Sequence, residues 1–181
     1  MRIIAGAWRG RALVAPQGVA TRPTAERVRQ ALFDRLQHAP WGGPALLGDA
    51  VVLDGFAGTG ALGLEALSRG AAQAVFMETG RAALAALAAN IAACRAADRA
   101  RVLPVDATRP PPGRPCGLVF LDPPYGLGLA PRAAAALRGA GWLAADGVLV
   151  VETGRDEAVP ALGEPLAEMA HGAARITVWR V

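Results

Sequence analysis

Residues 51 to 152 alternate between short apolar runs and longer stretches whose composition favours a helix. The apolar runs lie at residues 51–54, 74–78, 101–106, 118–122 and 148–152, and helices are expected at about 60–69, 81–95 and 129–139. Strands that are apolar throughout are buried on both faces, and helical crossovers join them into a parallel sheet. Residues 166–181 read instead as two strands joined near His171 and Gly172. The pattern predicts an α/β fold, with a mostly parallel sheet, helices on both faces and a C-terminal antiparallel hairpin.

Each of the five apolar runs ends in a carboxylate. The five residues are Asp54, Glu78, Asp106, Asp122 and Glu152. Ligands bind beyond the carboxyl ends of the strands in an open parallel sheet, so we expect these acids to collect along one edge. A helix cap or a turn is the ordinary explanation for any one of them. We expect Glu152 to end its strand without a chemical role.

The first 40 residues have a different character from the rest. Residues 2–15 read as two short strands around a glycine-containing turn, and Thr24 can cap a helix that runs to about Leu36. A Pro/Gly-rich stretch at 38–49 then marks a boundary. We therefore expect a small hairpin-and-helix extension over residues 1–40 and a main domain over 41–181.

Charge is concentrated in this extension. All 19 basic residues are arginine. Residues 1–40 hold seven arginines and two acids, a net charge of +5. Residues 41–181 hold twelve arginines and thirteen acids, a net charge of −1. A basic segment on a neutral domain favours a polyanionic partner, although a solvated surface is the alternative. No apolar run is long enough for a membrane span or a signal peptide, so we expect a cytoplasmic protein. The two cysteines and two histidines form no metal-binding pattern, and no metal is expected.

A glycine-rich loop, DGFAGTGALG at residues 54–63, follows the first apolar run and opens a helix. This context is typical of a nucleotide-binding loop, and either a dinucleotide or S-adenosylmethionine could occupy it. Glu78 lies 18 residues after Gly60, a spacing that suits ribose hydroxyls in both cases. Asp54 favours S-adenosylmethionine, because its charge opposes a pyrophosphate but suits a sulfonium and an ammonium group. The candidate cofactor-binding residues are Asp54, Phe56, Gly58, Gly60, Glu78, Asp106 and Ala107, with Asp106 placed to accept from an adenine amino group.

A second motif, Asp122-Pro123-Pro124-Tyr125, follows the fourth apolar run. Proline lacks a backbone donor, so the Asp122 carboxylate and the Pro123 carbonyl concentrate acceptors at this turn. Such a turn can hold an exocyclic amine by its N–H groups and aim the nitrogen at an electrophilic methyl group. Tyr125 can stack on an extruded base. We expect these four residues to form the catalytic motif.

Together these segments resemble a known family. RIIAGAWRGR at the N-terminus, TRPTAERVRQALF and LDGFAGTGALGLEALSRGA, with the Asp-Pro-Pro-Tyr motif, resemble the bacterial RsmD family of class I S-adenosylmethionine-dependent methyltransferases. The resemblance runs from Arg2 to about Glu152. It implies a seven-stranded Rossmann-like sheet whose last strand is antiparallel, and methylation of a guanine N2 in 16S ribosomal RNA, at guanine-966. Thr79-Gly80 follows Glu78 where the family often has a second acid.

The resemblance also gives the basic extension a role. The candidate RNA-binding residues are Arg2, Trp8, Arg9, Arg11, Arg22, Arg27 and Arg29, with Trp8 either stacking on a base or, as we favour, packing under the hairpin. The implied partner is ribosomal RNA, within a small-subunit or assembly particle, with no membrane partner and a monomeric enzyme. Three other functions stay open: an amino-methyltransferase acting on adenine in DNA or on another RNA base, an NAD-dependent oxidoreductase, and a non-catalytic RNA-binding module.

Overall fold

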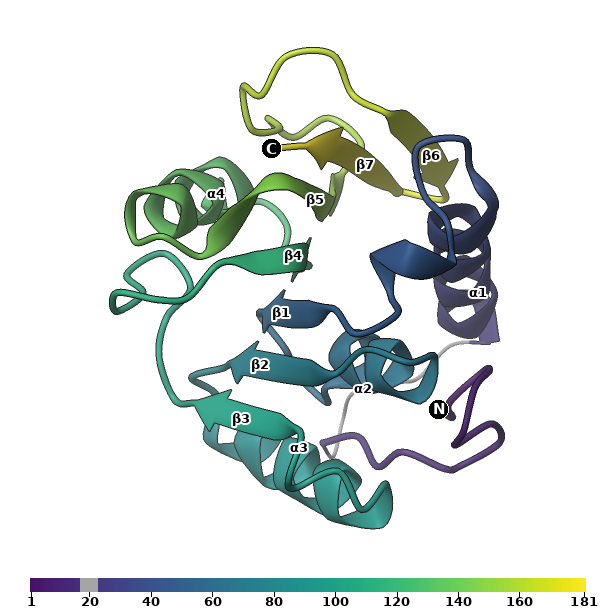
Figure 1. Cartoon of the computed structure of the whole chain (residues 1–181). Helices are drawn as coiled ribbons and strands as arrows, with labels where there is room; N and C mark the ends of the chain where they lie inside the picture. Colours follow the sequence, from purple (N-terminus) through teal and green to yellow (C-terminus); the bar gives the residue numbers. More distant parts are fainter. Residues whose placement is uncertain (17–22) are drawn as a thin grey trace.

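The computed structural model describes residues 1–16 and 23–181. Its strands are β1 (Val51–Gly55), β2 (Gln73–Met77), β3 (Ala100–Leu103), β4 (Cys116–Leu121), β5 (Leu143–Gly154), β6 (Ala167–His171) and β7 (Ala174–Arg180). Its helices are α1 (Pro23–His38), α2 (Ala61–Ser68), α3 (Arg81–Ala93) and α4 (Leu129–Gly139), with a short 3₁₀ helix at Pro44–Leu46. The strands form one sheet in the order β3-β2-β1-β4-β5-β7-β6 (Figure 1). Strands β1 to β5 are parallel, and β7 is antiparallel to both of its neighbours, so the predicted fold class is confirmed.

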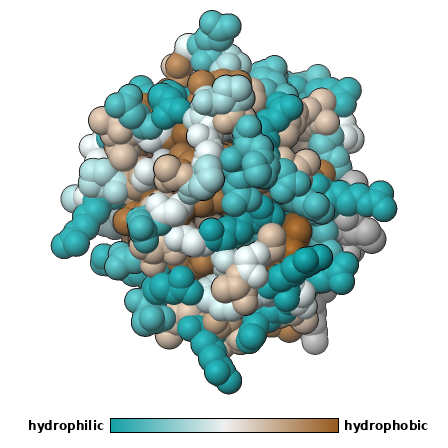
Figure 2. Space-filling view, turned by 45° about the vertical axis from the view of Figure 1, so that its right-hand side comes forward, coloured by the Kyte–Doolittle hydropathy of each residue, from teal (hydrophilic) through white to brown (hydrophobic). Residues whose placement is uncertain are grey.

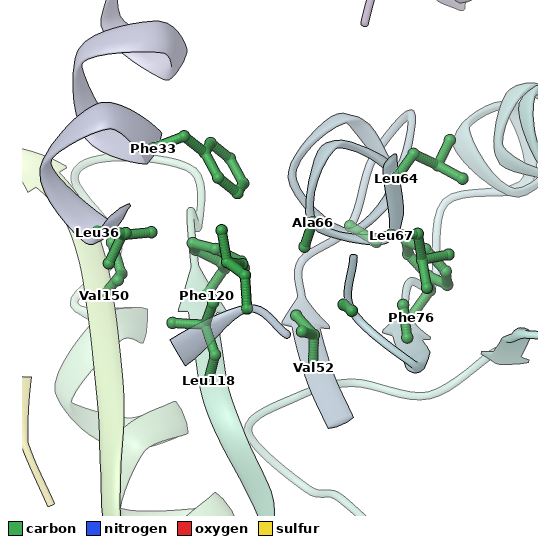
Figure 3. Packing of buried hydrophobic residues seen from close by; sticks show 14 of the residues in the cluster. Phe33, Leu36, Val52, Leu64, Ala66, Leu67, Phe76, Leu118, Phe120 and Val150 are labelled. Atoms are coloured by element: carbon green, nitrogen blue, oxygen red, sulfur yellow. The ribbon is translucent and has the colours of Figure 1, made fainter. Parts of the chain in front are cut away.

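Two apolar layers cover the sheet. On one face, α1, α2 and α3 pack on alternate residues of the central strands, and Phe33 of α1 lies 5.6 Å from Phe120 of β4 between ring centroids (Figure 3). On the other face, α4 packs through Ala133, Ala134 and Leu137. Because both faces are covered, the central strands are apolar at nearly every position, which is why the sequence reads as continuous runs.

The order of the strands places the functional edge. The chain builds outward from β1 to β2 and β3, then crosses back so that β4 lies on the other side of β1. A crevice opens outside the carboxyl ends of the strands where the order reverses. Here that position lies between the ends of β1 and β4, and the sequence places the glycine-rich loop after β1 and the Asp-Pro-Pro-Tyr motif after β4.

The crossover from β3 to β4 contains no helix, although the described residues there run without a gap. A helix is disfavoured in this segment, because the prolines at 110, 111, 112 and 115 lack the backbone N–H groups that a helix needs. Trp142 covers the segment instead: its indole N–H donates to the Pro111 carbonyl at 2.8 Å, and it is 4% exposed. A Cβ atom at Gly113 would lie 2.1 Å from the Trp142 ring, so this close approach requires glycine.

The N-terminal segment shares the main core. Its predicted hairpin is reduced to a single bridge between Arg2 and Ala12, and Ile3 and Leu13 are buried with the α1–α3 layer. A buried carboxylate, Glu65 of α2, holds the segment by accepting from the backbone N–H groups of Ile4 (2.8 Å) and Ala5 (3.0 Å). Figure 2 turns this side of the molecule forward and shows apolar residues between projecting hydrophilic side chains.

No helix among the described residues is long and apolar enough to cross a membrane. The same residues contain no group of three or more His, Cys, Asp or Glu side chains arranged to hold a metal ion. Cys94 and Cys116 are buried and free.

Candidate functional site

A cavity of about 1080 Å³ opens at the carboxyl ends of the central strands. All five strand-terminal acids line it, which confirms that they collect along one edge. The glycine-rich loop, the Asp-Pro-Pro-Tyr turn, part of α1 and the turn between β6 and β7 complete its walls. Apolar side chains such as Phe56, Leu62 and Phe120 lie between the acids, so the cavity combines apolar walls with a few carboxylates.

Three of the four glycines in the loop, Gly58, Gly60 and Gly63, have different roles. Gly58 lines the cavity at φ +53° with nothing within 4 Å of an added Cβ, so its backbone is open to a ligand. Gly60, at φ +78°, is not among the described residues that line the cavity. A Cβ atom added at Gly60 would lie 2.4 Å from Leu87. A Cβ atom added at Gly63 would lie 2.4 Å from the Phe76 ring. Gly63 therefore lets α2 approach the sheet, and Gly60 lets the start of α2 approach α3. The assignment of Gly60 to the cofactor stays a prediction.

Asp54 is buried beneath the loop. Its Oδ2 atom accepts from the backbone N–H of Gly63 at 2.9 Å and so ties the end of β1 to the first turn of α2. Burial raises the pKa of Asp54 to about 7; the Gly63 hydrogen bond opposes this rise, and Glu78 adds to it. A cationic ligand in the cavity would relieve this unfavourable burial of negative charge.

Glu78 closes the other side of the loop. Its Oε2 atom accepts from Gly58 N at 2.8 Å, and Oε1 accepts from the backbone N–H groups of Thr79 and Gly80 at 2.7 and 2.6 Å. A carboxylate can accept about four hydrogen bonds, so lone pairs remain for ribose hydroxyls. The contact with Gly58 shows that Glu78 also shapes the glycine loop itself.

Asp106 lies at the border of the main cavity and a small adjoining one of about 30 Å³. Its Oδ1 atom accepts from the backbone N–H and the hydroxyl of Thr108, both at 2.8 Å. These bonds, led by the one from the backbone N–H, lower the pKa of Asp106. Ala107 lines only the small cavity and is 2% exposed. Phe56 lines both cavities, so these three residues bound one narrow recess.

The Asp-Pro-Pro-Tyr turn faces the cavity directly. No N–H or O–H group of residues 1–16 or 26–181 donates to the Asp122 carboxylate or to the Pro123 carbonyl. The Asp122 side chain is exposed because it opens into the cavity, yet the surrounding protein displaces enough water to raise its pKa, and the charges of Glu152 and Asp54 raise it further. The turn therefore presents unused acceptors.

Two acids that were not predicted to act at this turn contact it. The Tyr125 hydroxyl donates to Oε1 of Glu152. The prediction that Glu152 ends its strand was wrong, because β5 continues to Gly154. Glu157 accepts from the backbone N–H of Gly126 and, at 2.7 Å, from that of Gly154. Burial first, and then Glu152, raise the pKa of Tyr125. The sequence placed Glu152 at a strand end but offered no signal that it would meet a tyrosine 27 positions away.

The predicted RNA-contacting residues fall into separate groups. Arg9 and Arg11 are exposed near the C-terminal ends of α2 and α3, where Trp8 N donates to Ser68 and Arg11 donates to the Ala93 carbonyl. Arg2 is exposed beside Glu26, which lines the cavity, at 3.3 Å.

The other candidates differ in exposure. Arg27 is exposed, whereas Arg29 is 6% exposed, donates to the Arg2 carbonyl and lies 3.8 Å from Glu65. Arg29 also lines the cavity, and its contact with RNA stays a prediction. Trp8 packs against the core and lies under the Arg99 guanidinium at 5.0 Å, as favoured from the sequence. Arg22 lies outside the described residues.

Comparison with known proteins adds an independent finding. The family model described as "Conserved hypothetical protein 95" matches residues 1–180. The ribosomal RNA small subunit methyltransferase D of Escherichia coli strain K12 is 42% identical over 88% of this chain and 78% of its own length. The protein of the same name from Haemophilus influenzae is 36% identical over 87% of this chain and 80% of its own length.

Solved structures agree. The Escherichia coli protein yhhF superposes with a TM-score of 0.85 at 39% identity, covering 99% of this chain and 97% of its own. An RNA methyltransferase from Salinibacter ruber in complex with S-adenosyl-L-homocysteine has a TM-score of 0.64 at 15% identity over 90% of this chain and 94% of its own, a likeness of fold alone. With a family model over nearly the whole chain and relatives this similar, the chain belongs to the RsmD-like family of methyltransferases.

Proposed function

We propose that this protein transfers a methyl group from S-adenosylmethionine to the exocyclic N2 of a guanine in small-subunit ribosomal RNA. The observation that carries the proposal is the pair of unused acceptors at Asp122 and Pro123, which open into the same cavity as the glycine-rich loop. An exocyclic amine has two N–H groups, and this turn offers one acceptor for each. The names of the bacterial relatives support ribosomal RNA as the substrate. Guanine-966 of 16S RNA is the position we propose.

The cavity fits the cofactor by its charge. Asp54 and Glu78 bring two carboxylates beside the open backbone of Gly58, a poor environment for a pyrophosphate and a good one for a molecule that carries a sulfonium and an ammonium group. When bound, S-adenosylmethionine supplies an electrophilic methyl group. We propose that Glu78 holds its ribose hydroxyls, and that Asp106 and Phe56 border the place of its adenine.

Asp122 acts on the amine. The nitrogen of a guanine amine is a weak nucleophile, because its lone pair is delocalised into the ring. Hydrogen bonds from its N–H groups to Asp122 and to the Pro123 carbonyl orient the nitrogen and increase its electron density. The Asp122 carboxylate also faces the positive charge that develops on the nitrogen, and it can take the proton after methyl transfer. Tyr125, which is 45% exposed, provides a flat surface on which an extruded base can stack.

A nucleoside mass analysis tests the reaction and the substrate together. Ribosomal RNA from cells with and without the gene should differ by one N2-methylguanosine in the small-subunit RNA, and complementation by the Asp122→Asn variant should leave it unmethylated. A gain of N6-methyladenosine instead would support the adenine alternative. Equal methylation in both strains would remove the proposal.

A calorimetric titration tests the cofactor separately. S-adenosylmethionine should bind and NAD should not, because the latter brings a pyrophosphate to the acid-lined loop. Glu78→Ala should weaken S-adenosylmethionine binding by about 1.5–3 kcal/mol, the usual cost of lost hydrogen bonds to a charged group. Binding of NAD alone would favour the oxidoreductase alternative.

We propose that the enzyme acts as a monomer on ribosomal RNA within a small-subunit or assembly particle, in the cytoplasm where ribosomes assemble. The RNA-contacting extension would then be residues 1–40, with the exposed arginines Arg2, Arg9, Arg11 and Arg27 contacting phosphates.

A further inference from the structure

Glu152 lies beside Asp122 because of the register of two strands. Leu121, the last residue of β4, pairs with Val151 of β5, so Asp122 follows the end of β4 beside Glu152, which is still paired with Ile176 of β7. Glu152 lines the cavity and is partly exposed. The Asp122 carboxylate lines the same cavity.

One oxygen of Glu152 is engaged and the other is available. The Tyr125 hydroxyl donates to Oε1. No donor within residues 1–16 and 26–181 bonds to Oε2. A carboxylate that lines a substrate cavity with an unused oxygen is a ready acceptor for a donor on the substrate.

The chemistry of the bases says which substrate this acceptor suits. The guanine N2 amine is attached to the carbon next to N1, and N1 carries a hydrogen. The ring nitrogen next to the amine of adenine or cytosine carries no hydrogen and offers a lone pair instead. A carboxylate beside the amine therefore attracts guanine and repels the other two bases, since an acceptor facing an acceptor is left unpaired.

We infer that Glu152 makes the site selective for guanine, by accepting the ring N1–H beside the amine that Asp122 holds. The inference rests on the proposed function and adds a specificity determinant to it. Tyr125 fits this arrangement, because its hydroxyl fixes the Glu152 side chain while its ring remains available for stacking. Asp122 then positions the reacting amine, and Glu152 identifies the base.

The first test uses the wild-type enzyme and a base analogue. 2-Aminopurine keeps the N2 amine but has no hydrogen on N1. Small-subunit RNA would be ligated to carry guanine or 2-aminopurine at the methylated position and offered both free and as a reconstituted subunit. Guanine should be preferred by about 10²-fold or more in kcat/KM, since sites built to bond a substrate donor reject analogues that lack it. Equal rates would overturn the inference whatever any variant does.

The second test uses Glu152→Gln, because 2-aminopurine also lacks the guanine O6 atom. Glutamine can donate to the bare N1 of the analogue, so the preference for guanine should fall about tenfold or more. The O6 atom contributes equally to both enzymes and cancels in the comparison. If the glutamine variant does not fold by thermal melting, Glu152→Ala replaces it and should also reduce the preference.

Tyr125→Phe is the matched control. It removes the hydroxyl that holds Glu152 but keeps the carboxylate, so most of the preference for guanine should remain while the rate itself changes. If Tyr125→Phe and Glu152→Gln reduce the preference equally, Glu152 acts only through Tyr125 and the inference is wrong. Failure of the proposed function would give a different result. The wild-type enzyme would then not methylate guanine, either in the free RNA or in the reconstituted subunit.

Discussion

Asp122 joins two properties that enzymes exploit, an open acceptor and a raised pKa. The pKa of Asp122 is raised by desolvation and by the neighbouring charges of Glu152 and Asp54. Such a carboxylate is protonated at a higher pH than an ordinary aspartate. Because only the ionised form offers both oxygens as acceptors and faces the charge on the amine, its ionisation should control the reaction.

The single-turnover rate of methyl transfer should therefore rise with pH and level off only above the raised pKa of Asp122, at about 8 before a cationic cofactor lowers it. Asp122→Asn should lose this dependence and fall about 10²-fold or more in rate at high pH, the usual scale for a lost electrostatic partner. Rapid-quench measurements across the pH range, with saturating RNA and cofactor, give the profile. A wild-type rate that is flat with pH would separate Asp122 from the chemical step.

Asp54 shows the stability cost of the same electrostatics. Its pKa is about 7 in the folded protein against 3.8 for an unperturbed aspartate. Folding stability should therefore fall as pH rises from about 4, and the full penalty should be present above about 7. Asp54→Asn removes this titration and leaves an oxygen for Gly63 N. The variant should gain stability relative to wild type as pH rises, by at most about 4 kcal/mol, while it loses affinity for S-adenosylmethionine.

Urea unfolding of both proteins at pH 5 and pH 8 measures this difference. The free energy of unfolding of Asp54→Asn should exceed that of the wild type by more at pH 8 than at pH 5. A difference that does not change with pH would mean that Asp54 has an ordinary pKa in the folded protein.

At the scale of elements, the turn from β1 to α2 separates ligand binding from packing. Gly58→Ala meets no atom, so it should cost about 1 kcal/mol of stability from its left-handed backbone and chiefly weaken cofactor binding. Gly63→Ala would bring a methyl group to 2.4 Å from the buried Phe76 ring, so it should cost about 1–3 kcal/mol by overpacking. Thermal melting and calorimetric titration of the two variants give both quantities. Equal effects on melting would contradict this division of roles.

Glu65 of α2 anchors the N-terminal segment to the main core. It is fully buried, accepts from Ile4 N, Ala5 N and, at 2.8 Å, Arg69 Nε, and faces the buried Arg29. Glu65→Ala should destabilise the fold by about 3–5 kcal/mol, because it leaves buried charges and N–H groups unpaired. Asp34→Asn is the control: Asp34 lies 3.7 Å from Arg69 but is 52% exposed, so its loss should cost less than about 1 kcal/mol. Similar losses in chemical unfolding would show that Glu65 is not an anchor.

The elements differ in how far the sequence could predict them. The strands and helices from Val51 onward were predictable, because a sheet covered on both faces leaves a continuous apolar pattern. The positions of the five acids followed from the same pattern. The anchoring role of Glu65 was not predictable, since its partner Ile4 lies 61 residues away and no local pattern marks either residue. The contact between Tyr125 and Glu152 and the packing of Gly60 also depend on neighbours that only the assembled sheet supplies.

At the scale of the whole molecule, the arginine excess is spread around the N-terminal segment. Arg2 and Arg27 are exposed on the segment whose residues Met1 and Glu26 line the cavity, whereas Arg9 and Arg11 lie near the far ends of α2 and α3. Arg29 differs from these four, because it is buried against Glu65. An RNA that places one base in the cavity can therefore meet exposed arginines both beside the cavity and farther along the same side.

Each arginine that neutralises a phosphate releases a condensed counterion, so its removal should reduce the dependence of RNA affinity on salt. The double variants Arg2→Ala/Arg27→Ala and Arg9→Ala/Arg11→Ala should each lower the slope of log affinity against log salt by up to about 2 units, without changing S-adenosylmethionine affinity. Arg132→Ala/Arg138→Ala removes two exposed arginines from α4 on the other face of the sheet and should leave the slope at the wild-type value. Filter binding of small-subunit RNA at several salt concentrations gives all four slopes. Equal slopes for the three variants would show that the position of the arginines is irrelevant, and the N-terminal excess would then be an ordinary solvated surface.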